Sequence, residues 1–147
     1  EGFLPKFDYL ITEDISKDCV FADRMPLSRE LVSNLCRLLA DLHRVGVIHG
    51  DVNLRNLYRK SSGIWGVIDL DGCRLSSRPV GIRERRNERA RLASSFIRLT
   101  PYYGTAEDLS EDIPGVFAEE YKKFTEISVD SHIYRFRTGY LSQRKRK

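Results

Sequence analysis

The chain has 147 residues, of which 41% are hydrophobic and 31% charged, and its formal net charge is +4. The length allows one substantial core and the composition is that of a soluble globular protein, without any apolar run near the ~20 residues of a membrane-spanning helix. Its 3 cysteines are widely spaced, which argues against a disulfide framework or a zinc site and favours a reducing, cytoplasmic location.

The first part of the chain predicts a strand and then a long helix. The aromatic and β-branched run Phe7–Thr12 predicts the strand. From Pro26 onward leucines recur at spacings of three and four, which predicts an amphipathic helix with Ser28 as its N-cap and Gly46 as its stop. A short apolar step, Val47–Ile48, follows that helix.

The second part predicts a hairpin and two further helices. Leu57–Arg59 and Ile64–Asp69 predict two strands joined by a Ser-Ser-Gly turn. Helical spacing of apolar residues predicts helices over Arg83–Leu99 and Ile113–Phe124, and we expect Pro101–Gly104 to interrupt the helical structure between them. The expected fold class is therefore α+β.

The stretch from Val47 to Gly72 carries the candidate chemistry. Asp51 lies in a loop after the long helix, Asn56 lies five positions later, and Asp69 lies thirteen positions beyond Asn56 at the end of a hairpin strand. Phosphoryl transfer needs a carboxylate to accept a proton from the attacking hydroxyl, and oxygen ligands to hold Mg²⁺. Asp51 suits the first role, and Asn56 and Asp69 suit the second. The alternative is that these residues only cap turns.

This stretch resembles the catalytic and metal-binding loops of the protein-kinase-like superfamily. The HRDxxxxN motif corresponds to His49–Asn56, and DFG corresponds to Asp69–Asp71. The resemblance implies a protein-kinase-like fold with ATP and Mg²⁺ as cofactors. It also implies that residues 1–18 are the remnant of a small lobe and hinge, and that residues 19–147 are mainly the helical C-lobe with its small catalytic hairpin.

The same resemblance assigns roles in the site. It makes Asp51 the catalytic base, while His49 supports the loop or, as the alternative, transfers a proton. Asn53 occupies the position where Ser/Thr kinases usually carry a phosphate-contacting Lys, and the two metal ligands also contact the nucleotide. Backbone groups near Glu13 would meet the adenine of ATP. Because the chain shows no Gly-rich loop and no strand Lys, we expect either that it is part of a longer protein or that the protein has lost its nucleotide cover, and in both cases that this polypeptide binds ATP feebly alone.

Within the superfamily the chain is similar to the bacterial lipopolysaccharide kinases that act on Kdo or core heptose. The similarity lies in LLADLHRVGVIHGDVNLRN, GVIDLDGCRL and NERARLASSFIRL, and it covers about Asp8 to Leu99. Gly50 in place of the HRD Arg makes control by activation-loop phosphorylation less expected. Asp71 in place of the Gly of DFG, and the early start of the next helix, make a protein substrate less expected. The similarity implies phosphorylation of a sugar hydroxyl of lipopolysaccharide or lipid A at the cytoplasmic face of the inner membrane.

Basic clusters at residues 83–98 and 144–147 suit such an anionic acceptor or peripheral contact with an anionic membrane surface. The alternative is a solvated helix face and a tail. Two further functions remain open: a kinase-like enzyme acting on another small molecule or a Ser/Thr side chain, and a non-catalytic pseudokinase-like module that binds anionic lipid or nucleic acid. For the leading function we do not expect nucleic acid as a partner.

Five other side chains carry weaker expectations. We expect His43 and His132 to be surface histidines and Trp65 to pack in the core or in the hairpin. Cys73 is expected to be a buried, inert thiol. Arg55 either faces phosphate or acceptor or forms a surface ion pair.

Overall fold

The computed structural model describes residues 14–15, 17–109 and 112–125. The predicted strand Phe7–Thr12, Glu13, His132 and the basic cluster at residues 144–147 lie outside these ranges. The helices are α1 (Arg29–Arg44), α2 (Ile82–Ile97), α3 (Thr100–Tyr103) and α4 (Ile113–Phe124). The strands are β1 (Cys19–Phe21), β2 (Val47–Ile48), β3 (Leu57–Lys60), β4 (Trp65–Val67) and β5 (Arg74–Leu75). Two 3₁₀ turns, Ala22–Arg24 and Leu54–Asn56, complete the described elements, so the expected α+β class is confirmed.

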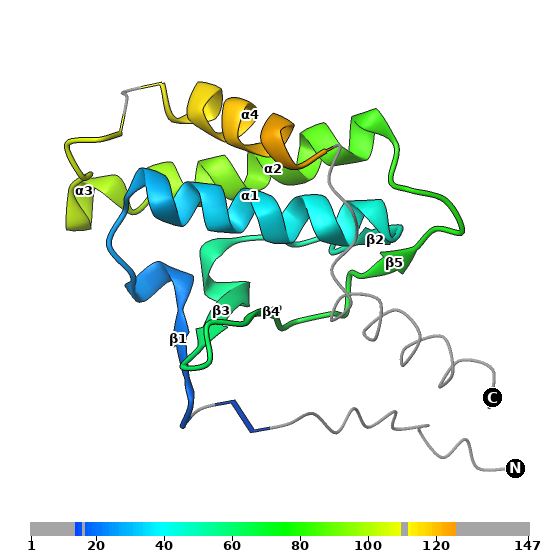
Figure 1. The fold of residues 1–147 in the computed structure, drawn as a ribbon, viewed down its shortest axis with the longest axis horizontal. Coiled ribbons are helices and arrows are strands. Elements are labelled where there is room, and N and C mark those ends of the chain that lie inside the picture. The colour runs from blue at the N-terminus through cyan, green and yellow to red at the C-terminus, as the bar shows by residue number, and fades with distance from the viewer. Residues whose placement is uncertain (1–13, 16, 110–111, 126–147) are drawn as a thin grey trace, which may run out of the picture.

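Helices and strands form separate layers. Helices α1, α2 and α4 lie side by side, and the strands lie on the other side of α1 (Figure 1). One sheet has the antiparallel order β1-β3-β4, and β2 pairs with β5 in a second, two-stranded sheet. The predicted hairpin is confirmed as β3–β4, although its second strand is shorter than the predicted Ile64–Asp69. Strands β1 and β5 were not predicted.

Helix α1 forms where the leucine spacing predicted it. The Ser28 hydroxyl accepts a hydrogen bond from the N–H of Leu31 at 3.2 Å, which caps one of the unpaired donors of the first turn. The chain leaves the helix at Gly46, whose φ of 82° disfavours other residues, and a Cβ there would lie 2.4 Å from the carbonyl oxygen of Ser76. The apolar face of the helix packs into the core, and all the leucines of the stripe are buried: Leu31, Leu35, Leu38, Leu39 and Leu42.

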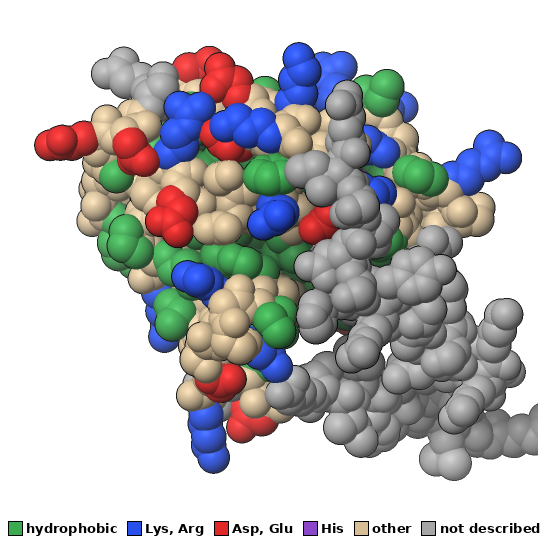
Figure 2. All heavy atoms as spheres, viewed as in Figure 1, with side chains coloured by type: hydrophobic (Ala, Val, Ile, Leu, Met, Phe, Trp, Pro, Cys, Tyr) green, Lys and Arg blue, Asp and Glu red, His purple; other side chains and the backbone are tan. Residues whose placement is uncertain are grey.

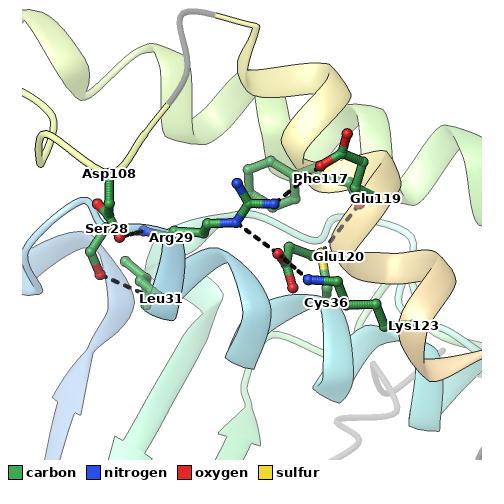
Figure 3. Close-up of polar contacts among 9 residues, drawn as sticks. All are labelled: Ser28, Arg29, Leu31, Cys36, Asp108, Phe117, Glu119, Glu120 and Lys123. Atoms are coloured by element: carbon green, nitrogen blue, oxygen red, sulfur yellow. Dashed lines mark hydrogen bonds and ion pairs between the residues drawn. The ribbon is translucent and has the colours of Figure 1, made fainter.

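Helix α4 is fastened to α1 by charged groups at one end of their contact (Figure 3). Arg29 of α1 reaches Glu119 at 3.1 Å and the buried Glu120 at 3.0 Å, and Lys123 reaches Glu120 at 2.7 Å. Burial raises the pKa of Glu120, but hydrogen bonds from Lys123 and Arg29 outweigh it, so the net pKa is lowered. Deeper in the interface the Cys36 thiol donates to the carbonyl oxygen of Phe117 at 3.5 Å, and burial raises the pKa of that thiol to about 12.

The region after α2 differs from the prediction. The helix spans Ile82–Ile97 instead of Arg83–Leu99, and Thr100–Tyr103 forms one further helical turn, α3, where an interruption was expected. Pro101 is tolerated there because it lies in the first turn, where a backbone N–H has no intrahelical partner. The helical turn ends at Gly104, whose φ is 67°.

One face of the molecule carries mixed charge, and the side chains of Trp65 and Cys73 near the core are only half-buried. On the face formed by α1 and α4, acidic and basic side chains alternate with exposed apolar ones (Figure 2). Trp65 is half-buried and packs against the core as predicted, whereas Cys73, predicted to be buried, is also only half-buried. No helix in the described ranges is long and apolar enough to cross a bilayer.

Candidate active site

The loop that carries the candidate residues runs from the end of β2 to the start of β3 and packs against α2. Its apolar side chains Val52 and Leu54 are each 1% exposed, so they fix the loop in the core. The N–H of Leu54 donates to the hydroxyl of Ser95 on α2 at 3.2 Å, and that hydroxyl donates to the carbonyl of Leu92 at 2.8 Å. The alternation of buried and exposed residues leaves Asp51 at the surface.

Asp51 and Asn53 contact one another. The Asn53 side-chain amide donates to the backbone carbonyl of Asp51 at 3.1 Å and lies 3.4 Å from its carboxylate oxygen Oδ2. The Asn53 carbonyl oxygen accepts from the N–H of Arg55 at 3.0 Å and so caps the 3₁₀ turn that follows. Asn53 therefore orients an exposed carboxylate by using both ends of its own amide.

Asn56 joins Asp51 to Asp69. Its side-chain N–H donates to the carbonyl of Asp51 at 3.0 Å and lies 3.4 Å from Oδ2 of Asp69. Among the described residues, Asp69 is the only non-glycine with positive φ, at 60°. Strained backbone of this kind clusters at functional sites. The Asn56 side chain thus contacts the backbone of Asp51 and the carboxylate of Asp69, and so links the three residues that the sequence predicted to converge.

These groups fit a magnesium ion. With the Asn56 N–H groups directed at Asp51 and Asp69, its amide oxygen accepts no hydrogen bond from the described residues. One amide oxygen and one carboxylate are hard oxygen donors, and Mg²⁺ commonly keeps several waters beside so few protein ligands. Within the described part of the chain, no three His, Cys, Asp or Glu side chains gather into a metal cluster, and such an ion does not require one.

His49 holds the loop to the hairpin. Its Nε2 lies 2.9 Å from the carbonyl oxygen of Ile68, and its Nδ1 lies 3.4 Å from the N–H of Asp51. A carbonyl only accepts and an N–H only donates, so the ring proton is on Nε2 and the lone pair on Nδ1. With 1% of its surface exposed, His49 is buried and both nitrogens are used, which supports the expectation of structural support over the alternative of proton transfer.

Glu88 of α2 holds the loop from its buried side, and the sequence analysis did not predict this residue. Its carboxylate accepts hydrogen bonds from the N–H of Gly50 at 2.6 Å and of His49 at 3.2 Å, and it lies 2.9 Å from Nε2 of His43. Burial raises the pKa of Glu88, but the hydrogen bonds from His43 and the two backbone groups outweigh it and the net pKa is lowered. A signal was present, since Glu88 precedes Leu92 and Phe96 at helical spacing on the buried face.

His43 was expected at the surface, and that expectation was wrong. The side chain is completely buried and lies between Glu88 and the hydroxyl of Tyr121, 2.8 Å from Nδ1. Burial of a polar side chain is tolerated when its hydrogen bonds are satisfied, and here both ring nitrogens have partners on other helices. The three helices are therefore joined beneath the loop by one polar chain from Tyr121 through His43 to Glu88.

A groove of about 1010 Å³ opens beside Asp51. One wall is the loop from Gly50 to Arg55 together with Asp23, and the other is the face of α2 with Arg91, Ser94 and Arg98. The Arg55 side chain is 81% exposed and its Nε lies 3.8 Å from Asp23, which is the surface ion pair of the two expectations for this residue. The loop wall therefore carries both carboxylates and the paired Arg55, whereas the opposite wall carries two arginines and no carboxylate.

Comparison with known proteins identifies one match. The model of the lipopolysaccharide kinase (Kdo/WaaP) family matches residues 11–121, which is more than half of the chain and includes the whole loop, the hairpin and α2. No curated protein matches the chain significantly.

Proposed function

The chain belongs to the lipopolysaccharide kinase (Kdo/WaaP) family, and we propose that it transfers the γ-phosphoryl group of ATP to a Kdo or heptose hydroxyl of lipopolysaccharide. Membership of this family implies a phosphotransferase that uses ATP and Mg²⁺ and acts on a sugar of the lipopolysaccharide core. The observation that carries the proposal is the convergence of Asp51, Asn56 and Asp69 through the single Asn56 amide.

Each residue of this cluster has a role in the proposed reaction. The acceptor hydroxyl hydrogen-bonds to the exposed Asp51 carboxylate, which Asn53 orients, and its oxygen attacks the γ-phosphorus while Asp51 accepts its proton. The bond from the γ-phosphorus to the bridging oxygen breaks, and ADP leaves with that electron pair. Asn56 and Asp69 would hold the Mg²⁺ that neutralises charge on the phosphates.

In the proposed function the chain has two parts with different roles. We assign residues 19–147 mainly to a protein-kinase-like catalytic lobe and residues 1–18 to the hinge and the remnant of a smaller lobe. Backbone groups near Glu13 would meet adenine in this assignment. The β3–β4 hairpin supports it, because the backbone N–H of Ile68 at its end bonds to the carbonyl of Asn56 at 2.9 Å and so brings the second motif back to the first.

The proposal is tested by three variants of the full-length protein, assayed with radiolabelled ATP and a Kdo-lipid A acceptor. Asp51→Asn and Asp69→Ala should each lower kcat by at least about a hundredfold, the range of general acid–base and charge-stabilising effects. The exposed Glu107→Gln is the matched control and should keep wild-type turnover. Circular dichroism checks that the variants are folded. Full turnover by folded Asp51→Asn would contradict the assignment and favour a binding module.

A further inference from the structure

We propose that Arg91 of α2 and Arg98, the C-cap residue of α2, bind an anionic substituent of the acceptor, a phosphate or a carboxylate, and so select charged sugars over neutral ones. This inference rests on the proposed function, because it concerns the groove beside the same Asp51. It adds a chemical requirement on the substrate that family membership does not give.

The two arginines lie on one face of α2 with small residues between them. They are seven positions apart, which is close to two helical turns and places them roughly 10 Å apart along the axis. Between and beside them the groove is lined by Ala90, Ser94 and Ser95, which leave room for a ligand. Both guanidinium groups can therefore reach one ligand lying along the groove.

Their guanidinium groups are available to a ligand, unlike those of Arg85 and Arg89 on the same helix. Arg85 donates to the carbonyl of Val80 at 2.5 Å, and Arg89 lies 5.4 Å over the ring of Tyr121, so these two serve packing. Among the described residues, neither Arg91 nor Arg98 has a hydrogen-bond or ion-pair partner for its side chain. Exposed cations facing a groove, with no internal carboxylate to neutralise them, attract and hold anions.

The opposite wall explains how the acceptor would be oriented. Asp51 and Asp23 lie on that wall, and Asp23 is already close to Arg55. Arg55 on the loop wall is paired with Asp23, so an anion is attracted most strongly by Arg91 and Arg98, whereas a neutral hydroxyl can hydrogen-bond to Asp51. The groove therefore directs the charged substituent to one wall and the reacting hydroxyl to the other. The guanidinium fork is also suited to paired hydrogen bonds with phosphate or carboxylate oxygens.

The face formed by α1 and α4 does not have this arrangement of charge. On the face of α1 and α4 basic side chains are interspersed with acidic ones (Figure 2), and Arg29 and Lys123 there are paired with glutamates. The anion site is therefore assigned to the groove and not to the general basicity of the chain.

The test uses Arg91→Gln, Arg98→Gln and the double variant in the full-length protein. The control is Arg83→Gln, an exposed arginine of the same helix that does not line the groove. Acceptors are Kdo-lipid A, the same molecule with its Kdo carboxylate methyl-esterified, and the same molecule without its lipid A phosphates. For each combination of enzyme variant and acceptor we would measure kcat, the KM for acceptor and the KM for ATP. Binding of Kdo-lipid A micelles is measured separately, without ATP.

Each single variant should raise the KM for Kdo-lipid A about tenfold and the double variant more, with kcat and the KM for ATP unchanged. With the wild-type enzyme, the modified acceptor that lacks the recognised anion should have a higher KM than Kdo-lipid A. Which of the two modified acceptors shows this increase identifies the anion as the carboxylate or the phosphate. Unchanged KM in the double variant, or equal use of all three acceptors by wild type, would overturn the inference. If wild type binds the micelles but transfers no phosphate to them, the proposed function fails. In that case, loss of micelle binding in the double variant would still support the anion site.

Discussion

Replacing Glu88 by Gln removes the negative charge on which the candidate catalytic loop rests. The carboxylate accepts from the N–H groups of Gly50 and His49 and pairs with Nε2 of His43. An amide of the same shape keeps one accepting oxygen and presents an NH₂ group in place of the other. Oriented with its oxygen toward Gly50, it sets the NH₂ group against the N–H of His49, where two donors face each other.

The size of the effect follows from these contacts. His43 can adapt by moving its ring proton to Nδ1 and accepting from the new NH₂ group, because Tyr121 offers a hydroxyl oxygen on that side. The N–H of His49 cannot adapt, and a buried donor without a partner costs about 1–3 kcal/mol. Loss of charge weakens the remaining bonds further, so we expect the free energy of unfolding to fall by about 2–4 kcal/mol. For a domain of this size that is a decrease in Tm of about 10 °C.

Urea and thermal unfolding measure this loss, and steady-state kinetics measures its consequence for the loop. Because Glu88 touches the loop and not the substrates, kcat should fall while the KM for ATP stays near wild type. The exposed Glu107→Gln makes the same chemical change and should alter stability by less than about 0.5 kcal/mol. If Glu88→Gln unfolded like that control and kept its kcat, the loop would not depend on this carboxylate, and the reasoning would be refuted.

Three further predictions concern other parts of the structure. Cys36, whose pKa burial raises to about 12, should resist iodoacetamide at pH 8 in the folded protein while the half-buried Cys19 reacts, as peptide mass spectrometry would show. Gly63→Ala, with φ of 86° and only an arginine side-chain end within 4 Å of the new Cβ, should cost about 1 kcal/mol in urea unfolding. Gly50→Ala, with φ of 88° and a backbone oxygen 2.3 Å from the Cβ, should cost several times more, and equal losses would contradict the clash. Because the pKa of Glu120 is lowered, its stabilisation is present above the ordinary value of 4.5 and is lost as the pH falls below it, so Glu120→Gln should flatten that acid limb of the unfolding curve.

The elements that the sequence predicted well are those whose signal is local. The α1 helix has a leucine stripe, a side-chain cap and a terminal glycine, all within Ser28–Gly46, and each reports on its own neighbourhood. The same holds for the β3–β4 hairpin, because two short strands joined by a tight turn pair with each other as antiparallel neighbours. Asp51, Asn56 and Asp69 could be grouped because their order and spacing resemble two kinase motifs, and because a predicted hairpin returns the chain to the loop.

The features that were missed depend on residues far apart in the chain. Strand β1 pairs with β3 across about forty residues, from Cys19 to Lys60, and nothing in a run of three residues specifies a distant partner. His43 was misplaced for the same reason, since its burial depends on Glu88 and Tyr121 from other helices. Propensity and periodicity report which face of an element is apolar, but they do not report which polar groups satisfy one another across a core.

In the proposed function, helix α2 links the positioning of Asp51, the proposed base, with recognition of the acceptor. On its buried side Glu88 and Ser95 hold the backbone of the loop at Gly50 and Leu54, and on its open side Arg91 and Arg98 face the groove. Because a helix is stiff over two turns, the distance between the loop anchors and the arginines is fixed without any contact between them. An acceptor held by the arginines is then presented to Asp51 at a set position, and proximity of this kind supplies much of the rate in a reaction that needs little covalent chemistry from the protein. The same stiffness explains why a change at Glu88 should lower kcat, whereas a change at the arginines should raise the KM for acceptor.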